Sequence, residues 1–172
     1  MQNININANI VSLSNPITAD IVTAAIQRLN IVFNSVAFSN SLQAKSFVAT
    51  NNPALSLNGK TITGKDVYDN IFSKPQVEID IIVRKLNNPY KRYVSKTMGE
   101  TNPLGNTIIT YTWWLKNLSK GDLVKNYAVH LGHEIFHTNY FGYLHDPAIG
   151  TRDFDNDKDV TYAIDDILES LL

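Results

Sequence analysis

The chain has 172 residues, a formal net charge of −1 at pH 7 and no cysteine. This length predicts a single domain over residues 1–172 with enough chain to bury a substantial core. The lack of cysteine excludes disulfides, thiolate zinc sites and thiol catalysis. The near-zero charge, with no sustained basic run, argues against nucleic acid or an anionic membrane as a partner.

The opening segment, MQNININANIVSL, lacks the basic region and continuous apolar core of a signal peptide. No apolar run approaches the ~20 residues that span a bilayer. We therefore expect a soluble, monomeric protein that is cytoplasmic by default.

The first elements are a strand and a helix. Asn and Ile alternate over Asn3–Ile10, which predicts the strand. Asn15 or Thr18 can cap the helix, with Pro16 near its first turn. Apolar residues recur at the helical period over residues 21–33, so one face of this helix is expected to be buried.

The middle of the chain predicts a short helix and the strands of a sheet. Polar residues 49–65 favour a loop or a weak hairpin, and residues 64–75 an amphipathic helix. Val77–Leu86 is β-branched and almost continuously apolar, which predicts a strand buried on both faces. Residues 93–100 and 106–115 flank the turn-like TNPLGN and predict an antiparallel pair whose first strand is an exposed edge.

Two helices are expected in the last third of the chain. Asp122 can cap a helix through LVKNYAVHLGHEIFHT, and YAIDDILESLL predicts a final helix. This order of elements predicts a single α+β domain with α/β-like character.

All four histidines lie in HLGHEIFHTNYFGYLHD, residues 130–146. His133 and His137 are four positions apart on the predicted helix, so both imidazoles project from one face, about 6 Å apart along the axis. That spacing suits two zinc ligands. Glu134 lies about 100° round the helix from His133, where a base for a metal-activated water belongs.

A catalytic zinc ion takes three protein ligands and keeps one position open. His145 is the expected third ligand, because it follows a glycine at which the chain can turn back and imidazole is a common zinc ligand. Asp146 and Asp153 are the alternatives. His130, one turn before His133, is expected to pack near the site or support it rather than reach the ion.

A bare H-E-x-x-H also occurs by chance in helices that bind nothing. Three features favour metal binding here. The motif has apolar flanks, Gly132 leaves room beside the first ligand, and His145 is followed by Asp146.

One set of residues resembles the metzincin clan of zinc metallopeptidases, whose signature is H-E-x-x-H-x-x-G-x-x-H/D: His133, Glu134, His137, Gly142, His145 and Asp146. The chain is also similar to a group of minimal microbial and viral-type metallopeptidases. Their motif, like H-E-[WYF]-x-H-x-x-G-F-x-H-D, is followed by a segment like S-V-P-Y-A-I-G, and the counterpart here is DVTYAIDDI. VFNSVAFSNSL and GKDVYDNI add to this likeness.

The resemblance implies a zincin-like fold, with a twisted mixed sheet, a backing helix and an active-site helix below a cleft. It implies a zinc-dependent endopeptidase with one catalytic zinc ion and Glu134 as general base. The peptide or protein substrate would lie extended along an edge strand, for which Tyr93–Glu100 is the candidate.

The chain departs from the metzincin pattern in two ways. Gly142 and His145 each stand two positions later than the signature places them, so the helix is expected to end near Asn139 in a left-handed turn, with residues 140–144 looping back. The methionine of the Met-turn is also missing, and residues 161–163 would have to form the floor beneath the zinc.

Three alternatives stay open. GTRD, residues 150–153, resembles the aspzincin G-T-x-D, which would make Asp153 the third ligand. The domain could also be a zinc-stabilised binding module without turnover. A metal-dependent nuclease is a further rival, although the near-neutral charge, the histidine spacing and the presence of Glu134 argue against it.

Two further residue patterns carry weaker predictions. RDFDNDKD, residues 152–159, resembles half of a calcium loop but lacks its glycine and distal glutamate, so we expect a solvated acidic loop and no calcium. Tyr162 could donate a hydrogen bond to a developing oxyanion. The favoured prediction for Tyr162 is structural: it begins the last helix and packs beside Ile164 and Ile167.

Overall fold

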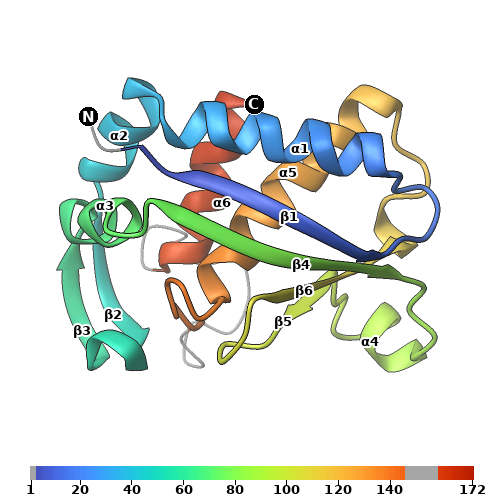
Figure 1. Ribbon diagram of the computed structural model, residues 1–172. Helices are drawn as coiled ribbons and strands as arrows, with labels where there is room; N and C mark the ends of the chain where they lie inside the picture. Colours follow the sequence, from blue (N-terminus) through green and yellow to red (C-terminus); the bar gives the residue numbers. More distant parts are fainter. Residues whose placement is uncertain (1–2, 146–158) are drawn as a thin grey trace.

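The computed structural model describes residues 3–145 and 159–172, apart from the side chains of residues 48–51 and 54. Helices and a mixed sheet together make an α+β fold, as the sequence predicted (Figure 1). The sheet order is β1 (Asn5–Ser12), β4 (Gln76–Arg84), β6 (Thr107–Tyr111), β5 (Gly99–Thr101). The first three strands are parallel, and β5 is an antiparallel edge strand.

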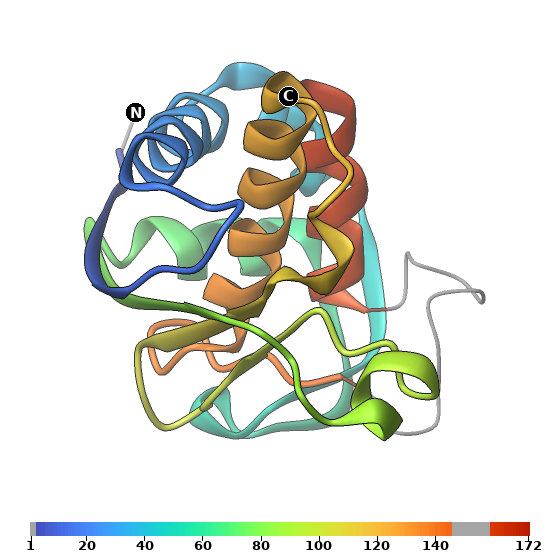
Figure 2. The ribbon, with the colours of Figure 1, turned by 90° about the vertical axis from the view of Figure 1, so that its right-hand side faces the viewer.

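Helices cover one face of this sheet. They are α1 (Ala19–Phe33), α5 (Lys120–His137) and α6 (Val160–Leu171), which lie side by side (Figure 2). The apolar face predicted for α1 is buried. The side-chain amide of Asn30 bonds the backbone of Ile6 in β1, and that of Asn34, the C-cap of α1, bonds the backbone of Ile4 just before the strand. These bonds fix α1 on β1.

The other face of the sheet is open. Along β4 the odd-numbered residues Val77–Val83 are buried, whereas Glu78 and Arg84 are exposed and Asp80 and Ile82 are half-buried. The prediction of a strand buried on both faces is therefore wrong. The apolar run arises because Ile82 stands on the open face among polar neighbours.

A smaller unit packs against the end of the helical layer. It consists of α2 (Val36–Gln43), α3 (Gly64–Phe72) and an antiparallel hairpin of β2 (Ser46–Asn52) and β3 (Leu57–Thr63), joined by the 3₁₀ turn Pro53–Leu55. The sequence indicated this hairpin only weakly. The side chain of Asp66 and the hydroxyl of Thr63 form a reciprocal cap that starts α3.

Residues 93–100 do not form the predicted strand. Asn88 caps a short helix, α4 (Pro89–Tyr93), which begins at proline, and only Gly99–Thr101 pair with β6 as the edge strand β5. After β6, a 3₁₀ turn at Thr112–Trp114 leads towards α5.

Of two predicted helix starts, that of α5 is shifted and that of α1 is confirmed. Ser119 rather than Asp122 is the N-cap of α5, and the Ser119 hydroxyl contacts the Asp122 carboxylate. Thr18, one of the two positions predicted to cap α1, is its N-cap, although the Thr18 side chain makes no capping hydrogen bond; Pro16 lies just before the helix. In the described part of the chain no single helix is long and apolar enough to cross a membrane; α1 and α2 pass that test only as a pair bent by 65°.

Candidate metal centre

The close packing of α5 on α6 sets the position of the site. A Cβ atom added to Gly132 would lie 2.2 Å from Leu168 Cδ1 and 3.3 Å from Leu29 Cδ2. A larger residue at this position would push the Leu168 and Leu29 side chains aside, so glycine favours the close approach of the three helices. The approach brings Asp165 and Tyr162 of α6 to the histidine face of α5.

A tight turn returns the chain to the helix. α5 ends at His137, and the backbone N–H groups of Gly142 and Tyr143 donate to the carbonyls of Thr138 and Phe136 at 2.7 and 2.9 Å. The left-handed residue is Gly142, with φ of 70°, and not Asn139 as predicted. Glycine takes this conformation without strain, so the longer loop closes and places His145 beside the helix.

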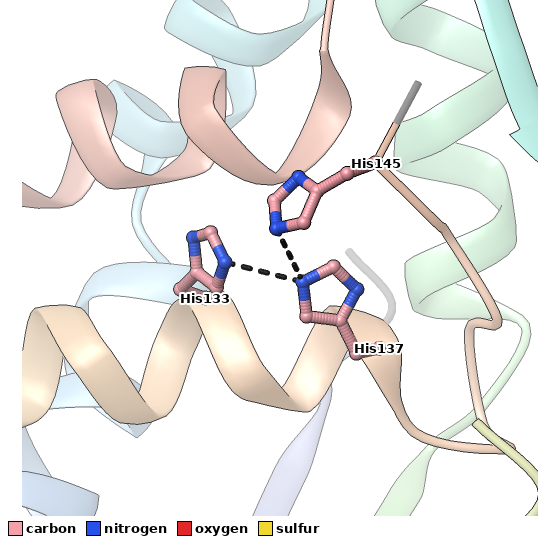
Figure 3. A group of neighbouring side chains, drawn as sticks. All are labelled: His133, His137 and His145. Carbon is pink, nitrogen blue, oxygen red and sulfur yellow. Dashed lines mark hydrogen bonds between the residues drawn. The ribbon is translucent and has the colours of Figure 1, made fainter. Parts of the chain in front are cut away.

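His133, His137 and His145 converge on one point (Figure 3). The Nε2 atom of His137 lies 3.1 Å from that of His133 and 3.1 Å from that of His145. The rings of His133 and His137 are largely buried, while the His145 side chain is 41% exposed. The predicted three-histidine cluster is thus present, with one side open to solvent.

Each ring is held through its other nitrogen. His133 Nδ1 lies 2.9 Å from Asp165 Oδ2. His137 Nδ1 lies 2.6 Å from the Tyr143 carbonyl oxygen, and His145 Nδ1 lies 3.1 Å from Asp159 Oδ2. A carbonyl or carboxylate oxygen only accepts, so each Nδ1 carries the hydrogen. Each neutral ring then presents a lone pair at Nε2 towards the other two.

Three lone pairs facing one point repel one another unless a cation lies between them. Tetrahedral zinc at 2.0–2.1 Å from each nitrogen separates its ligand atoms by about 3.3 Å, close to the observed spacing. A proton is the alternative cation, but it can join only two of the three nitrogens. The geometry therefore fits a metal ion better than a shared proton.

Burial and neighbouring charges shift the pKa values of the histidines and of the carboxylate next to them. Burial alone would lower the pKa of His133, but the Asp165 carboxylate raises it overall. Burial and the neighbouring histidines lower the pKa of His137 to about 3, which keeps it neutral. Burial would raise the pKa of Asp159, yet the bonds with His145 and Thr161 lower it to about 2.

Glu134 lies at the edge strand. Its Oε2 accepts a hydrogen bond of 2.7 Å from the Thr101 hydroxyl at the end of β5, and its Oε1 lies 3.8 Å from His130 Nδ1. The residue is only 7% exposed, and burial raises its pKa although His133 and Thr101 oppose the rise. The carboxylate of Glu134 thus extends from α5 to the edge strand β5.

His130 stays outside the cluster, as expected. Its Nε2 lies 3.1 Å from the Thr110 hydroxyl, and burial lowers its pKa to about 3. A Cβ atom on Gly99 would lie 2.4 Å from the His130 ring, so β5 approaches this helix only through glycine.

Tyr162 lies in the first turn of α6, and its ring stacks on His145 at a centroid distance of 4.7 Å. Residues 161–163 thus begin a helix at the cluster. Asp159 is the N-cap of α6, accepting from the backbone of Thr161, and belongs to the site rather than to a solvated loop. The other predicted positions, Asp146, Asp153 and the rest of the 152–159 run, lie outside the described residues.

The sequence did not point to Thr101 or Asp165. No motif marks Thr101, because β5 and α5 meet only in the folded chain. Asp165 carried a weak signal, since it stands three positions after Tyr162 as a carboxylate on an otherwise apolar helix face.

Comparisons of the chain with protein-family models, with curated proteins and with solved structures found no match. The functional argument therefore rests on the geometry of this site and on the residues of this chain.

Proposed function

We propose that the protein is a zinc-dependent endopeptidase in which His133, His137 and His145 hold one zinc ion and Glu134 is the general base. The observation that carries this proposal is the convergence of three Nε2 lone pairs next to a buried carboxylate at the edge of a sheet. A bound zinc ion supplies Lewis acidity there, which polarises a carbonyl group and lowers the pKa of a coordinated water.

The groups behind the histidines orient the ligands. Asp165, Asp159 and the Tyr143 carbonyl accept from the Nδ1 atoms, which fixes the tautomer and the plane of each ring. Tyr162 acts through His145, because its stacked ring limits rotation of the most exposed ligand.

Glu134 takes the proton of the attacking water and returns it to the leaving amine. The Thr101 hydroxyl holds Oε2, and Oε1, which lies 3.8 Å from His130 Nδ1, is the atom assigned to the transfer. The unpaired side of β5 offers backbone groups to an extended substrate, so the edge for substrate binding is Gly99–Thr101 and not Tyr93–Glu100.

Metal analysis combined with a mass-spectrometric cleavage profile tests this proposal. We expect one zinc ion per chain in the wild type and in Glu134→Gln, with cleavage lowered by at least ~100-fold in the variant. Glu78→Gln, on the exposed face of β4, is the matched control and should cleave as the wild type does. Equal cleavage by Glu134→Gln would refute the role of Glu134.

The rival is a zinc-stabilised binding module with the same ligands. It predicts stoichiometric zinc but no cleavage of any peptide at any pH. That outcome would replace the enzymatic proposal while leaving the metal site intact.

A further inference from the structure

Positive charge is concentrated around α4. Residues 84–96 contain five of the chain's 15 Lys and Arg residues, and no Asp or Glu stands between Asp80 and Glu100. The five are Arg84, Lys85, Lys91, Arg92 and Lys96. The net charge of −1 conceals this local excess, because acidic residues elsewhere balance it.

One nearby carboxylate neutralises only part of this charge. Glu100 on β5 pairs with Lys91 and accepts a hydrogen bond of 2.9 Å from the Tyr111 hydroxyl. Arg84 donates to the same hydroxyl at 3.2 Å. Within residues 3–145 and 159–172, Lys85, Arg92 and Lys96 form no ion pair.

Large apolar side chains are exposed between these cations. Tyr90, Tyr93 and Val94 are 65%, 67% and 63% exposed. Of the aromatic side chains that the structure describes, only these two tyrosines are strongly exposed. Several exposed apolar side chains close together indicate an interaction surface, whereas a single exposed apolar residue does not.

The segment that carries these side chains is fixed to the sheet. Thr97 N–H donates to the Lys91 carbonyl at 2.9 Å, and Trp113 Nε1 donates to the Thr97 carbonyl at 2.8 Å. The Tyr111 N–H donates to the Met98 carbonyl at 2.9 Å. A surface held in this way loses little conformational entropy when a partner binds.

We propose that an acidic, partly apolar stretch of the peptide substrate binds the α4 surface, which we define as Lys85, Tyr90, Arg92, Tyr93, Val94 and Lys96. This inference rests on the proposed peptidase function. Lys96 precedes Thr101, the partner of Glu134, by five positions, and α4 lies next to β5 in the view of Figure 1. A peptide paired with β5 extends ~3.3 Å per residue, so it reaches this surface within several residues of the cleaved bond.

Charge along β5 favours a peptide over a nucleic acid. Glu100 lies on β5, and the Glu134 carboxylate contacts Thr101 at the end of the same strand. A nucleic acid carries a negative charge on every phosphate, so these two carboxylates would repel it. A peptide backbone is neutral and is not repelled. The cations then attract Asp and Glu side chains, and the two tyrosine rings pack on apolar ones.

The cleavage profile of the zinc-loaded enzyme tests this specificity. We expect Asp and Glu to be enriched on one side of the cleaved bond only. Charge reversal in Lys85→Glu/Arg92→Glu/Lys96→Glu should abolish that enrichment. The control Lys60→Glu/Lys74→Glu/Lys120→Glu changes net charge equally on exposed positions elsewhere and should keep it. A wild-type profile without acidic enrichment would overturn the inference.

A binding measurement separates this inference from the proposed function. Zinc-loaded Glu134→Gln should bind a short fluorescein-labelled peptide of alternating Glu and Leu, and the α4 charge reversal should weaken binding about tenfold. If the Glu–Leu peptide binds but the wild type cleaves no peptide, the peptidase proposal is wrong and the assignment of the α4 surface as a peptide-binding site still holds. Tighter binding of single-stranded RNA or of phosphatidylserine vesicles, or equal binding of a Lys–Leu peptide, would overturn the assigned partner.

Discussion

His145 is the candidate ligand that the sequence left most open, because Asp146 and Asp153 were alternatives. Its Nε2 lies 3.1 Å from that of His137. We expect His145→Ala to weaken zinc affinity by more than ~100-fold, beyond the losses typical of residues that only support a ligand. Competition titration with a chelator measures this. Asp146→Ala and Asp153→Ala are the controls, and a larger loss from Asp153 would favour the aspzincin-like alternative.

Asp165 Oδ2 lies 2.9 Å from His133 Nδ1, and in the proposed site it orients this ring without itself binding the metal ion. Asp165→Asn keeps the shape of the side chain but removes its negative charge. The new amide can also turn its NH₂ group towards Nδ1, which breaks the hydrogen bond with His133. We therefore expect zinc affinity to fall about 10–100-fold in the same titration. Asp20→Asn changes an exposed carboxylate on α1 and is the matched control. Equal affinities in the two variants would contradict the orienting role of Asp165.

At the scale of elements, the contact between α5 and α6 depends on Gly132. Gly132→Ala would place a methyl group against Leu168 and Leu29, so we expect the free energy of unfolding to fall by about 1–3 kcal/mol. Gly121, in the same helix, has open space around it, and Gly121→Ala should be neutral or stabilise by up to ~1 kcal/mol. Chemical denaturation compares the two variants; equal destabilisation would contradict this packing.

Elements whose apolar residues or ligands recur at a regular spacing in the sequence were predictable. Elements that depend on contacts between residues far apart in the sequence were not. The apolar spacing of α1 and the four-residue spacing of His133 and His137 are local, and both predictions were confirmed. The segment 93–100 differs from its predicted strand because the helix that Asn88 caps extends to Tyr93, and only Gly99 and Glu100 of the segment pair with β6. Thr101 and Asp165 escaped prediction because β5 and α6 join the site only through tertiary packing.

For the whole molecule, buried histidine makes stability depend on pH. Burial, with His133 as a smaller cause, lowers the pKa of His130 to about 3, against about 6.5 in an unfolded chain. Between these pH values the unfolded state binds the extra proton, so the free energy of unfolding falls as the pH falls. One histidine contributes a slope of about 1.4 kcal/mol per pH unit.

Chemical denaturation of the zinc-free protein at several pH values below 6.5 checks this slope. His130→Gln removes the titrating group, so the variant should lose stability less steeply than the wild type on acidification, whatever its stability at pH 7. His137 titrates in the same direction and leaves a residual slope. Identical slopes in the two proteins would show that His130 is not held neutral by the fold.

The claim that one metal ion sits among three imidazoles is tested most directly by zinc K-edge X-ray absorption on the zinc-loaded protein. We predict one zinc ion per chain with three imidazole nitrogens at about 2.0–2.1 Å, and one imidazole fewer in His145→Ala. Substoichiometric zinc, or a wild-type spectrum with fewer than three imidazoles, would contradict the proposed site.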